Sequence, residues 1–355
     1  MKSENHIELP PLLTAFIENR LQQLGTTITN EKFLAQQVQI LSDFYIENPK
    51  AETPDFSTNK AAEIASLIYY FPLNFLRNLK VFREAQRIDF LKDIENIVEF
   101  GSGLGPSSWA LKSIPELNGL RNFLWIEKNS SAKNYAENFT KNFSQNNFSL
   151  SQNYKEETVS NWSKKNSLAV FSYSLTELKE LPQWSKDFEA LAIIEPSTQE
   201  DGRKLQELRS QLIQMGYSIW APCLHEMDCP LLKHSKKDWC HDRLFFNRPS
   251  WLEKIENHLP WKNNSLTFSY LLARKKSPPW KNSQQQNTAR VIGDTLYEKG
   301  KTRQMICKND ERLFLAWLSK NSTAPQIPRG SIIQWNEHVQ KSNEIRPSGE
   351  IKTLS

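Results

Sequence analysis

The feature that most limits what this chain can fold into is a short apolar run followed by a glycine-rich turn, VEFGSGLG at residues 98–105. The apolar run is typical of a buried strand, and Pro106 suits the first turn of a helix after the glycines. Because glycine has no side chain, the backbone of such a turn can approach a ligand closely, and the N–H groups of the following helix can bind its polar groups. The segment therefore predicts a ligand-binding turn between a strand and a helix.

Short apolar strands alternate with helical segments along the middle of the chain. The predicted strands cover residues 97–100, 123–126, 168–172, 191–194 and 217–220. Such alternation is typical of a parallel, doubly wound α/β sheet. A later segment with period-two alternation, residues 266–273, is expected to complete the sheet.

Periodicity and composition divide the chain into four parts. Helical periodicity predicts an N-terminal helical domain, in which Pro72 is expected to break one long apolar stretch into two helices. A short meander of strands is expected after a polar linker, and the polar C-terminal end is expected to be loosely ordered. The predicted parts are 1–93 (helical), 94–275 (α/β, with a cysteine loop at 221–250), 288–320 (β subdomain) and 321–355 (polar tail).

The glycine turn has the pattern GxGxG, which differs from the GxGxxG of NAD and FAD sites. An acid two residues before the first glycine is typical of S-adenosylmethionine sites, and an acid that ends the next predicted strand suits the ribose hydroxyls. A tight turn needed only for packing is the alternative. The candidate cofactor-binding residues are Glu99, Gly101, Ser102, Gly103, Gly105 and Glu127.

Two further candidates follow the predicted strand at 168–172. Tyr173 and Glu177 would lie at the same carboxyl edge of the sheet as the glycine turn, where either could act as a general base. Loop packing and helix capping are the alternative roles. No Asn-Pro-Pro-Tyr motif follows a strand here, so the sequence does not assign the atom that would be methylated.

All four cysteines lie after residue 220 of the chain, with the spacing C-x5-C-x10-C-x66-C. They are Cys223, Cys229 and Cys240 in one polar loop and Cys307 far downstream. Thiolates are soft ligands that select zinc or iron–sulfur centres. The chain has no CxxC pair of the kind found in zinc ribbons, and three clustered cysteines with a distant fourth are compatible with a 4Fe-4S cluster.

Two alternatives to the cluster stay open. The nearby residues His225, His234 and His241 allow zinc with a mixed ligand set, and the cysteines could also be buried free thiols. A metal centre here would have a mainly structural role, because ligand binding across the long gap to Cys307 would fasten the C-terminal strands.

Charge is unevenly distributed along the chain. Residues 1–200 hold 20 Lys and Arg against 25 Asp and Glu, whereas residues 201–355 hold 25 against 15. A basic C-terminal half predicts an anionic partner such as nucleic acid. No apolar run approaches the roughly 20 residues of a membrane span, and the N-terminus lacks the apolar core of a secretory signal. We therefore expect a cytoplasmic protein with no membrane contact. We also expect a monomer.

The chain resembles the methyltransferase-like proteins associated with the small ribosomal subunit, a family with bacterial and mitochondrial members. The matching segments are APCLH (221–225), CPL (229–231), DWCH (238–241), EFGSG (99–103), YSLTEL (173–178), IEP (194–196) and FSYL (268–271). The resemblance implies a class I S-adenosylmethionine-dependent methyltransferase fold for the α/β domain and a 4Fe-4S cluster on the four cysteines.

The same resemblance implies a partner and a function. The partner would be the small ribosomal subunit and its rRNA, and the protein would be a methyltransferase or a non-catalytic ribosome assembly factor. Ser197 and Asp242 depart from the family pattern, in which a glycine and an aromatic residue are usual at these positions.

Overall fold

The structure is a computed structural model of the whole chain. It describes residues 7–48, 51–151, 159, 161–175, 178, 180–279, 287–319 and 324–354. The chain forms two compact units, Met1–Ile194 with Leu244–Leu266, and Glu195–Arg243 with Thr267–Ser355. No helix in the described part of the chain is long and apolar enough to cross a membrane.

Helices fill the N-terminal part of the first unit, as the sequence predicts. They are α1 Pro11–Gln23, α2 Glu31–Glu47, α3 Lys60–Ala65, the π-helical turn η1 Ser66–Tyr70 and α4 Phe71–Arg87. The predicted break at Pro72 is wrong, because α3, η1 and α4 follow one another without interruption. In the wider π-helical turn the Phe71 N–H donates to Ser66 O, and Pro72, which has no N–H, falls in the first turn of α4.

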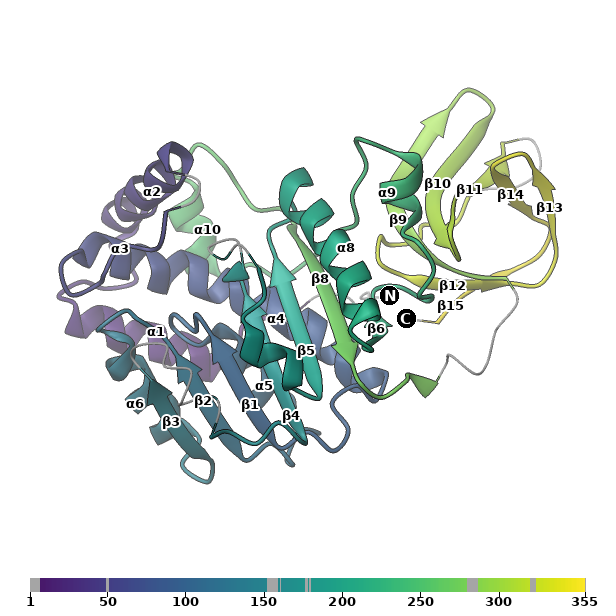
Figure 1. The fold of residues 1–355 in the computed structure, drawn as a ribbon. Coiled ribbons are helices and arrows are strands. Elements are labelled where there is room, and N and C mark those ends of the chain that lie inside the picture. The colour runs from purple at the N-terminus through teal and green to yellow at the C-terminus, as the bar shows by residue number, and fades with distance from the viewer. Residues whose placement is uncertain are drawn as a thin grey trace. The chain divides into compact units, whose positions relative to one another are not determined.

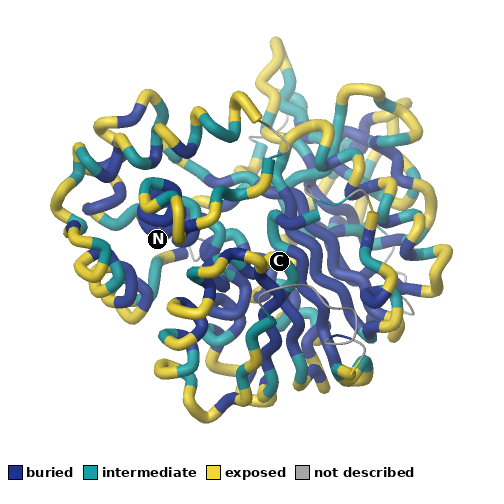
Figure 2. Tube along the Cα trace, turned by 60° about the vertical axis from the view of Figure 1, so that its left-hand side comes forward, coloured by how far each residue is buried: buried dark blue, intermediate teal, exposed yellow. Residues whose placement is uncertain are grey.

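A parallel sheet forms the centre of the first unit (Figure 1). Its strands are β1 Asn96–Phe100, β2 Asn122–Ile126, β3 Asn147–Ser151, β4 Ser167–Ser172 and β5 Ala190–Glu195. They run in the order β3-β2-β1-β4-β5, and every pair is parallel. Their residues are largely buried except in β3. Figure 2 shows the buried strands at the centre of the trace and the exposed residues around them. The sequence missed β3, because the polar segment NFSLS lies half exposed at the sheet edge.

Both faces of this sheet are covered. The helices and turns that follow its strands are α5 Pro106–Lys112, α6 Ala132–Asn142 and the 3-10 turn η3 Gln183–Asp187, and α10 Ser250–Glu256 packs on α2. On one face the Trp125 ring lies 5.2 Å from Phe139 of α6, and on the other the Phe171 ring stacks on Trp184 of η3 at 5.8 Å. Helices and turns on both faces of a parallel sheet confirm the predicted doubly wound α/β class.

The second unit begins with α8 Gln199–Gln214, β6 Ser218–Ala221, α9 Pro230–His234, β7 Asp242–Leu244 and β8 Leu266–Arg274. Strand β8 pairs with β6 in antiparallel register, with Ser218 opposite Arg274. The cysteine loop joins β6 to β7, and α9 lies within it.

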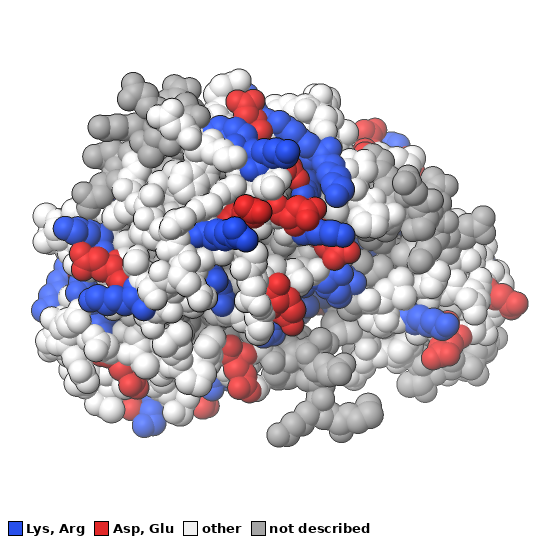
Figure 3. Space-filling view, turned by 90° about the horizontal axis from the view of Figure 1, so that it is seen from below, with Lys and Arg blue, Asp and Glu red and all other residues white. Residues whose placement is uncertain are grey.

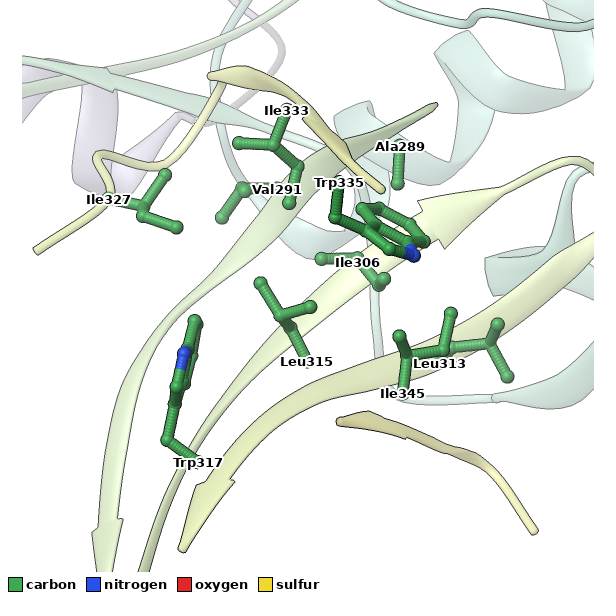
Figure 4. Close-up of a cluster of buried hydrophobic side chains, with 10 residues drawn as sticks. All are labelled: Ala289, Val291, Ile306, Leu313, Leu315, Trp317, Ile327, Ile333, Trp335 and Ile345. Atoms are coloured by element: carbon green, nitrogen blue, oxygen red, sulfur yellow. The ribbon is translucent and has the colours of Figure 1, made fainter. Parts of the chain in front are cut away.

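A seven-stranded sheet follows at the C-terminus, in the order β13-β14-β11-β10-β9-β12-β15. Its strands are β9 Thr288–Glu298, β10 Lys301–Lys308, β11 Glu311–Leu318, β12 Ile332–Trp335, β13 His338–Lys341, β14 Glu344–Pro347 and β15 Ile351–Thr353. The expected loose order at the C-terminal end is wrong, because Ile333, Trp335 and Ile345 are buried in the core of this sheet (Figure 4). The last three strands, β13 to β15, are only three or four residues long and carry few apolar side chains, so the composition of this segment is polar.

Candidate functional site

The glycine turn follows β1 directly, and Gly101, Gly103 and Gly105 have φ values of +62°, +52° and +78°. This backbone conformation favours glycine. A Cβ on Gly101 would lie 2.8 Å from Ser174 Cβ, and one on Gly105 would lie 2.1 Å from the Trp125 ring. A Cβ on Gly103 would meet no atom within 4 Å. Two of the glycines are therefore required by packing, whereas the space beside Gly103 is open.

Glu127 lies beside this turn, at the end of β2. The Gly103 N–H donates to Glu127 Oε2 at 2.7 Å, and the Asn129 N–H donates to Oε1 at 2.8 Å. The Ser102 hydroxyl is buried and has no hydrogen-bond partner among the described residues. The structure thus brings together a carboxylate, an open glycine and an unpartnered hydroxyl at the carboxyl end of the sheet. These groups fit a ligand that carries hydroxyl and amino groups.

Glu99 is buried rather than exposed in this site. Its carboxylate accepts the backbone N–H groups of Ser107 and Ser108 at 3.2 and 3.0 Å and the Ser108 hydroxyl at 2.5 Å. Burial raises the pKa of Glu99 to about 7, although these hydrogen bonds oppose the shift. The Trp125 Nε1–H donates to the same Ser108 hydroxyl at 2.7 Å. Glu99 therefore holds the N-terminus of α5 against the sheet.

Tyr173 follows β4 at the same edge of the sheet. It has a φ of +59°, and its N–H donates to Ile194 O at 2.8 Å. Positive φ is uncommon for a bulky residue, and such strain clusters at functional sites. The Arg77 guanidinium lies 5.5 Å from the centre of the Tyr173 ring. The other candidate base, Glu177, lies outside the described residues.

Sequence reasoning missed two groups of residues at this edge. Asn78 of α4 is fully buried and donates to Ser172 Oγ at 2.9 Å, and its polar side chain within the apolar face of α4 was the available signal. Asp55 accepts the Ser130 hydroxyl at 2.9 Å, and the Phe56 N–H donates to Asn129 Oδ1 at 3.4 Å. The segment before α3 therefore covers the loop that follows Glu127. Nothing in its sequence predicts this contact.

The four cysteines line one cavity within the second unit. Cys223, Cys229 and Cys240 come from the cysteine loop and Cys307 comes from β10. The cavity has a volume of about 40 Å³, on a measure by which one water molecule needs roughly 10–15 Å³. Burial raises the pKa of the Cys229, Cys240 and Cys307 thiols.

Among the described side chains, no group of three or more His, Cys, Asp or Glu residues forms a site that could hold a metal ion. The structure therefore gathers the four thiols around one cavity without arranging them as the ligands of a single ion. Of the three nearby histidines, His225 lines the cavity, whereas the His241 ring stacks on Trp239.

Arg209 of α8 also lines this cavity and is only 2% exposed. Its Nη2 donates to His225 O at 2.6 Å, and His225 Nε2 lies 3.6 Å from Cys307 Sγ. Burial opposes the charged guanidinium, but the Cys223 and Cys229 sulfurs and a hydrogen bond with Cys223 raise the pKa of Arg209. Burial, followed by the charge of Arg209, lowers the pKa of His225 to about 4. The cavity therefore has a cationic wall.

Helix α8 also anchors the cysteine loop. The Trp239 ring occupies the space beside Gly202, where a Cβ would lie 2.5 Å from it. Arg203 Nη1 donates to Ser235 O at 3.0 Å and to Asp238 O at 2.9 Å. Glycine and arginine at these positions of α8 thus let the loop lie close against the helix.

The loop is joined to the C-terminal sheet by a buried ion pair. Arg290 Nη2 on β9 donates to Asp242 Oδ2 at 2.6 Å, and their side chains are 3% and 6% exposed. The same nitrogen donates to the Tyr270 hydroxyl at 2.7 Å, and Ser269 Oγ donates to Cys240 O at 2.9 Å. The departure from the family pattern at Asp242 is thus matched by a buried cation on β9.

A parallel doubly wound sheet with strand order β3-β2-β1-β4-β5 and a glycine turn after β1 is the class I methyltransferase-like fold that the sequence predicts. The chain belongs to the family described as mitochondrial small ribosomal subunit Rsm22, whose model matches residues 62–336. This match confirms the family resemblance that the sequence segments indicated. No match was found among curated protein sequences.

Solved structures similar to this chain include a methyltransferase, a complex with S-adenosyl-homocysteine and an rRNA methylase. A precorrin-6y C5,15-methyltransferase from Geobacter metallireducens GS-15 has a TM-score of 0.34 and 15% identity over 54% of this chain and 88% of that chain. TrmK from M. capricolum, in complex with S-adenosyl-homocysteine, has a TM-score of 0.32 and 12% identity over 56% and 69% of the two chains. An rRNA methylase from Streptococcus thermophilus has a TM-score of 0.31 and 14% identity over 54% and 94%.

Proposed function

We propose that this protein is an S-adenosylmethionine-dependent methyltransferase that acts on the rRNA of the small ribosomal subunit. The observation that carries the proposal is the group formed by Glu127, Gly103 and Ser102 at the carboxyl end of the sheet. Ligands of doubly wound sheets bind at this end of the strands. Membership of a small-subunit ribosomal family supports the choice of substrate.

In this proposal each residue of the turn has its own role. Glu127 would accept the ribose hydroxyls, and the Gly103 N–H, which it now holds, would be free to bind the ligand. The Ser102 hydroxyl would gain the partner that it lacks. Glu99 would hold the N-terminus of α5 through its hydrogen bonds with Ser107 and Ser108. The cofactor supplies an electrophilic methyl group, and the gain in rate would come mainly from positioning the RNA nucleophile.

The proton acceptor for the reaction is proposed at the edge beyond β4. Of the two candidates, Tyr173 lies in the part of the chain that the structure describes. Its strained backbone and its contact with Arg77 support a functional role at this edge. Glu177 is the second candidate. Both candidate roles follow from the sequence and stay predictions.

The RNA partner is proposed from the family and from the excess of basic residues after position 200. On the face drawn in Figure 3, Lys and Arg side chains gather towards the upper middle with Asp and Glu side chains among them. The monomeric state and the cytoplasmic location stay predictions, and the family description names a mitochondrial ribosome.

We also propose that Cys223, Cys229, Cys240 and Cys307 hold a 4Fe-4S cluster, with zinc as the alternative. Their common cavity and the cationic wall formed by Arg209 support a centre with bound thiolates. The cluster would join the cysteine loop to β10 and so stabilise the second unit.

The methyltransferase proposal is tested by titrating the protein with S-adenosyl-homocysteine in a calorimeter and by measuring transfer of labelled methyl groups to small-subunit RNA. We expect binding by the wild type and a loss of at least about tenfold in affinity in Glu127→Gln, because the amide accepts one hydrogen bond fewer at the turn. Gly119→Ala, at an exposed position where a Cβ meets no atom within 4 Å, serves as the control. A wild type that binds no ligand would contradict the proposal.

A non-catalytic assembly factor is the second candidate function. It is favoured by the fact that Glu99 and Glu127 both accept backbone N–H groups, so neither is placed as a proton acceptor. Such a protein would bind RNA and support subunit assembly equally well as wild type and as Glu127→Gln. Methyl transfer that is lost in Glu127→Gln, with RNA binding unchanged, would decide for the enzyme.

A further inference from the structure

Two polar side chains of α8, Gln206 and Arg209, line the cysteine cavity. They are three residues apart, so they share a face of the helix. Their residues are 6% and 2% exposed. Both amide atoms of Gln206 and the Nε of Arg209 are buried and have no hydrogen-bond partner among the described residues. The cavity therefore has a polar wall that the protein satisfies only in part, since Arg209 Nη2 donates to His225 O while these three atoms lack a partner.

The charge of this wall is not balanced by a carboxylate. The described residues that line the cavity include no Asp or Glu, and within the described part of the chain no ion pair of Arg209 is present. A buried guanidinium without an anionic partner is strongly unfavourable. The sulfurs of the four cysteines are the groups around the cavity that become anionic when they bind a metal.

We propose that α8 supplies the polar wall of the metal–sulfur centre, with Arg209 as the counter-charge of the four thiolates and Gln206 as an amide donor to them. The inference rests on the proposed function, since it requires a centre on the four cysteines. Positive charge and N–H donors near cluster sulfurs stabilise the more negative oxidation state and therefore raise the reduction potential. They also stabilise bound thiolates and so slow the loss of metal.

The test compares Gln206→Leu, Arg209→Met and Arg209→Lys with the wild type after anaerobic purification. Lys204→Met is the matched control, because Lys204 lies on the same helix with its side chain 61% exposed. The measurements are iron and sulfide per chain, the reduction potential by titration with dithionite, and the half-life of the centre in a chelator. Circular dichroism reports whether each variant is folded.

We expect Gln206→Leu to shift the potential to more negative values and to shorten the half-life several-fold. Arg209→Met should have a larger effect, and Arg209→Lys should lie between it and the wild type because it keeps the charge. Lys204→Met should match the wild type. If Arg209→Met fails to fold, Gln206→Leu and Arg209→Lys decide the question.

Folded Gln206→Leu and Arg209→Lys variants with the potential and half-life of the wild type would overturn the inference and leave the centre itself standing. A wild type without metal would overturn both the centre and the inference. If the wild type holds zinc, the rate at which a chelator removes zinc from the same variants is the deciding quantity, with the same expected order.

Discussion

The ring of Trp125 occupies the space that a side chain on Gly105 would need, since a Cβ there would lie 2.1 Å from Trp125 Cζ2. Gly105 also has a φ of +78°. We expect Gly105→Ala to lower the free energy of unfolding by at least about 2 kcal/mol, from overpacking and from the left-handed backbone. Urea unfolding followed by circular dichroism measures this change.

The control for this prediction is Gly119→Ala, where a Cβ meets no atom within 4 Å. It should leave the free energy of unfolding within about 0.5 kcal/mol of the wild type. Equal effects at Gly105 and Gly119 would show that Trp125 does not pack as described.

The buried carboxyl group of Glu99 makes stability depend on pH. Its pKa is about 7 in the folded protein, against an ordinary value of 4.5. The folded state therefore binds more protons than the unfolded state between these values, and the contribution of Glu99 to stability is lost as the pH rises through this window. The shift corresponds to roughly 3 kcal/mol.

Glu99→Gln removes this titration and keeps the shape of the side chain. Urea unfolding at pH 5 and pH 8 should show that the wild type loses about 2.5 kcal/mol relative to Glu99→Gln over this range. Glu137→Gln serves as the matched control, because it makes the same change at an exposed position of α6 and alters no buried carboxyl group. A difference between wild type and Glu99→Gln that does not change with pH would contradict the account.

The Asp242–Arg290 pair should hold the cysteine loop to β9 whether or not metal is bound. Asp242→Asn and Arg290→Met should each cost about 3–5 kcal/mol, because each leaves a buried partner unpaired. The double variant should cost less than the sum of the two. Chemical unfolding of all four proteins measures the coupling energy, and strict additivity would mean that the pair does not interact as the 2.6 Å contact indicates.

Strands β1, β2, β4 and β5 could be predicted because each carries a run of buried apolar residues. Val98 and Leu124 lie in such runs, and the glycine turn marks the carboxyl edge of the sheet. Strands β9, β10 and β11 correspond to the predicted meander at 288–320. Strand β3 and the last four strands, β12 to β15, were not predicted, because they are short and most of them carry few apolar residues. Ile345, for example, is fully buried in a short strand whose last two residues are half-buried.

The sequence predicted that the four cysteines come together, but it did not predict that Gln206 and Arg209 line the same cavity. Spacing predicted that Cys307 would join the loop cysteines, and the structure places all four around one cavity. The buried face of α8 carries Gln206 and Arg209 beside Leu205 and Leu212. Polar residues on a buried face are recognisable only once the cavity that they line is known.

The most direct test of this account is to purify the protein without oxygen and to quantify iron, sulfide and zinc per chain. The account predicts about four iron and four sulfide ions, with loss of both in Cys307→Ser. One zinc and no iron would contradict the cluster and leave a zinc-stapled methyltransferase, and the absence of any metal would contradict the metal centre altogether.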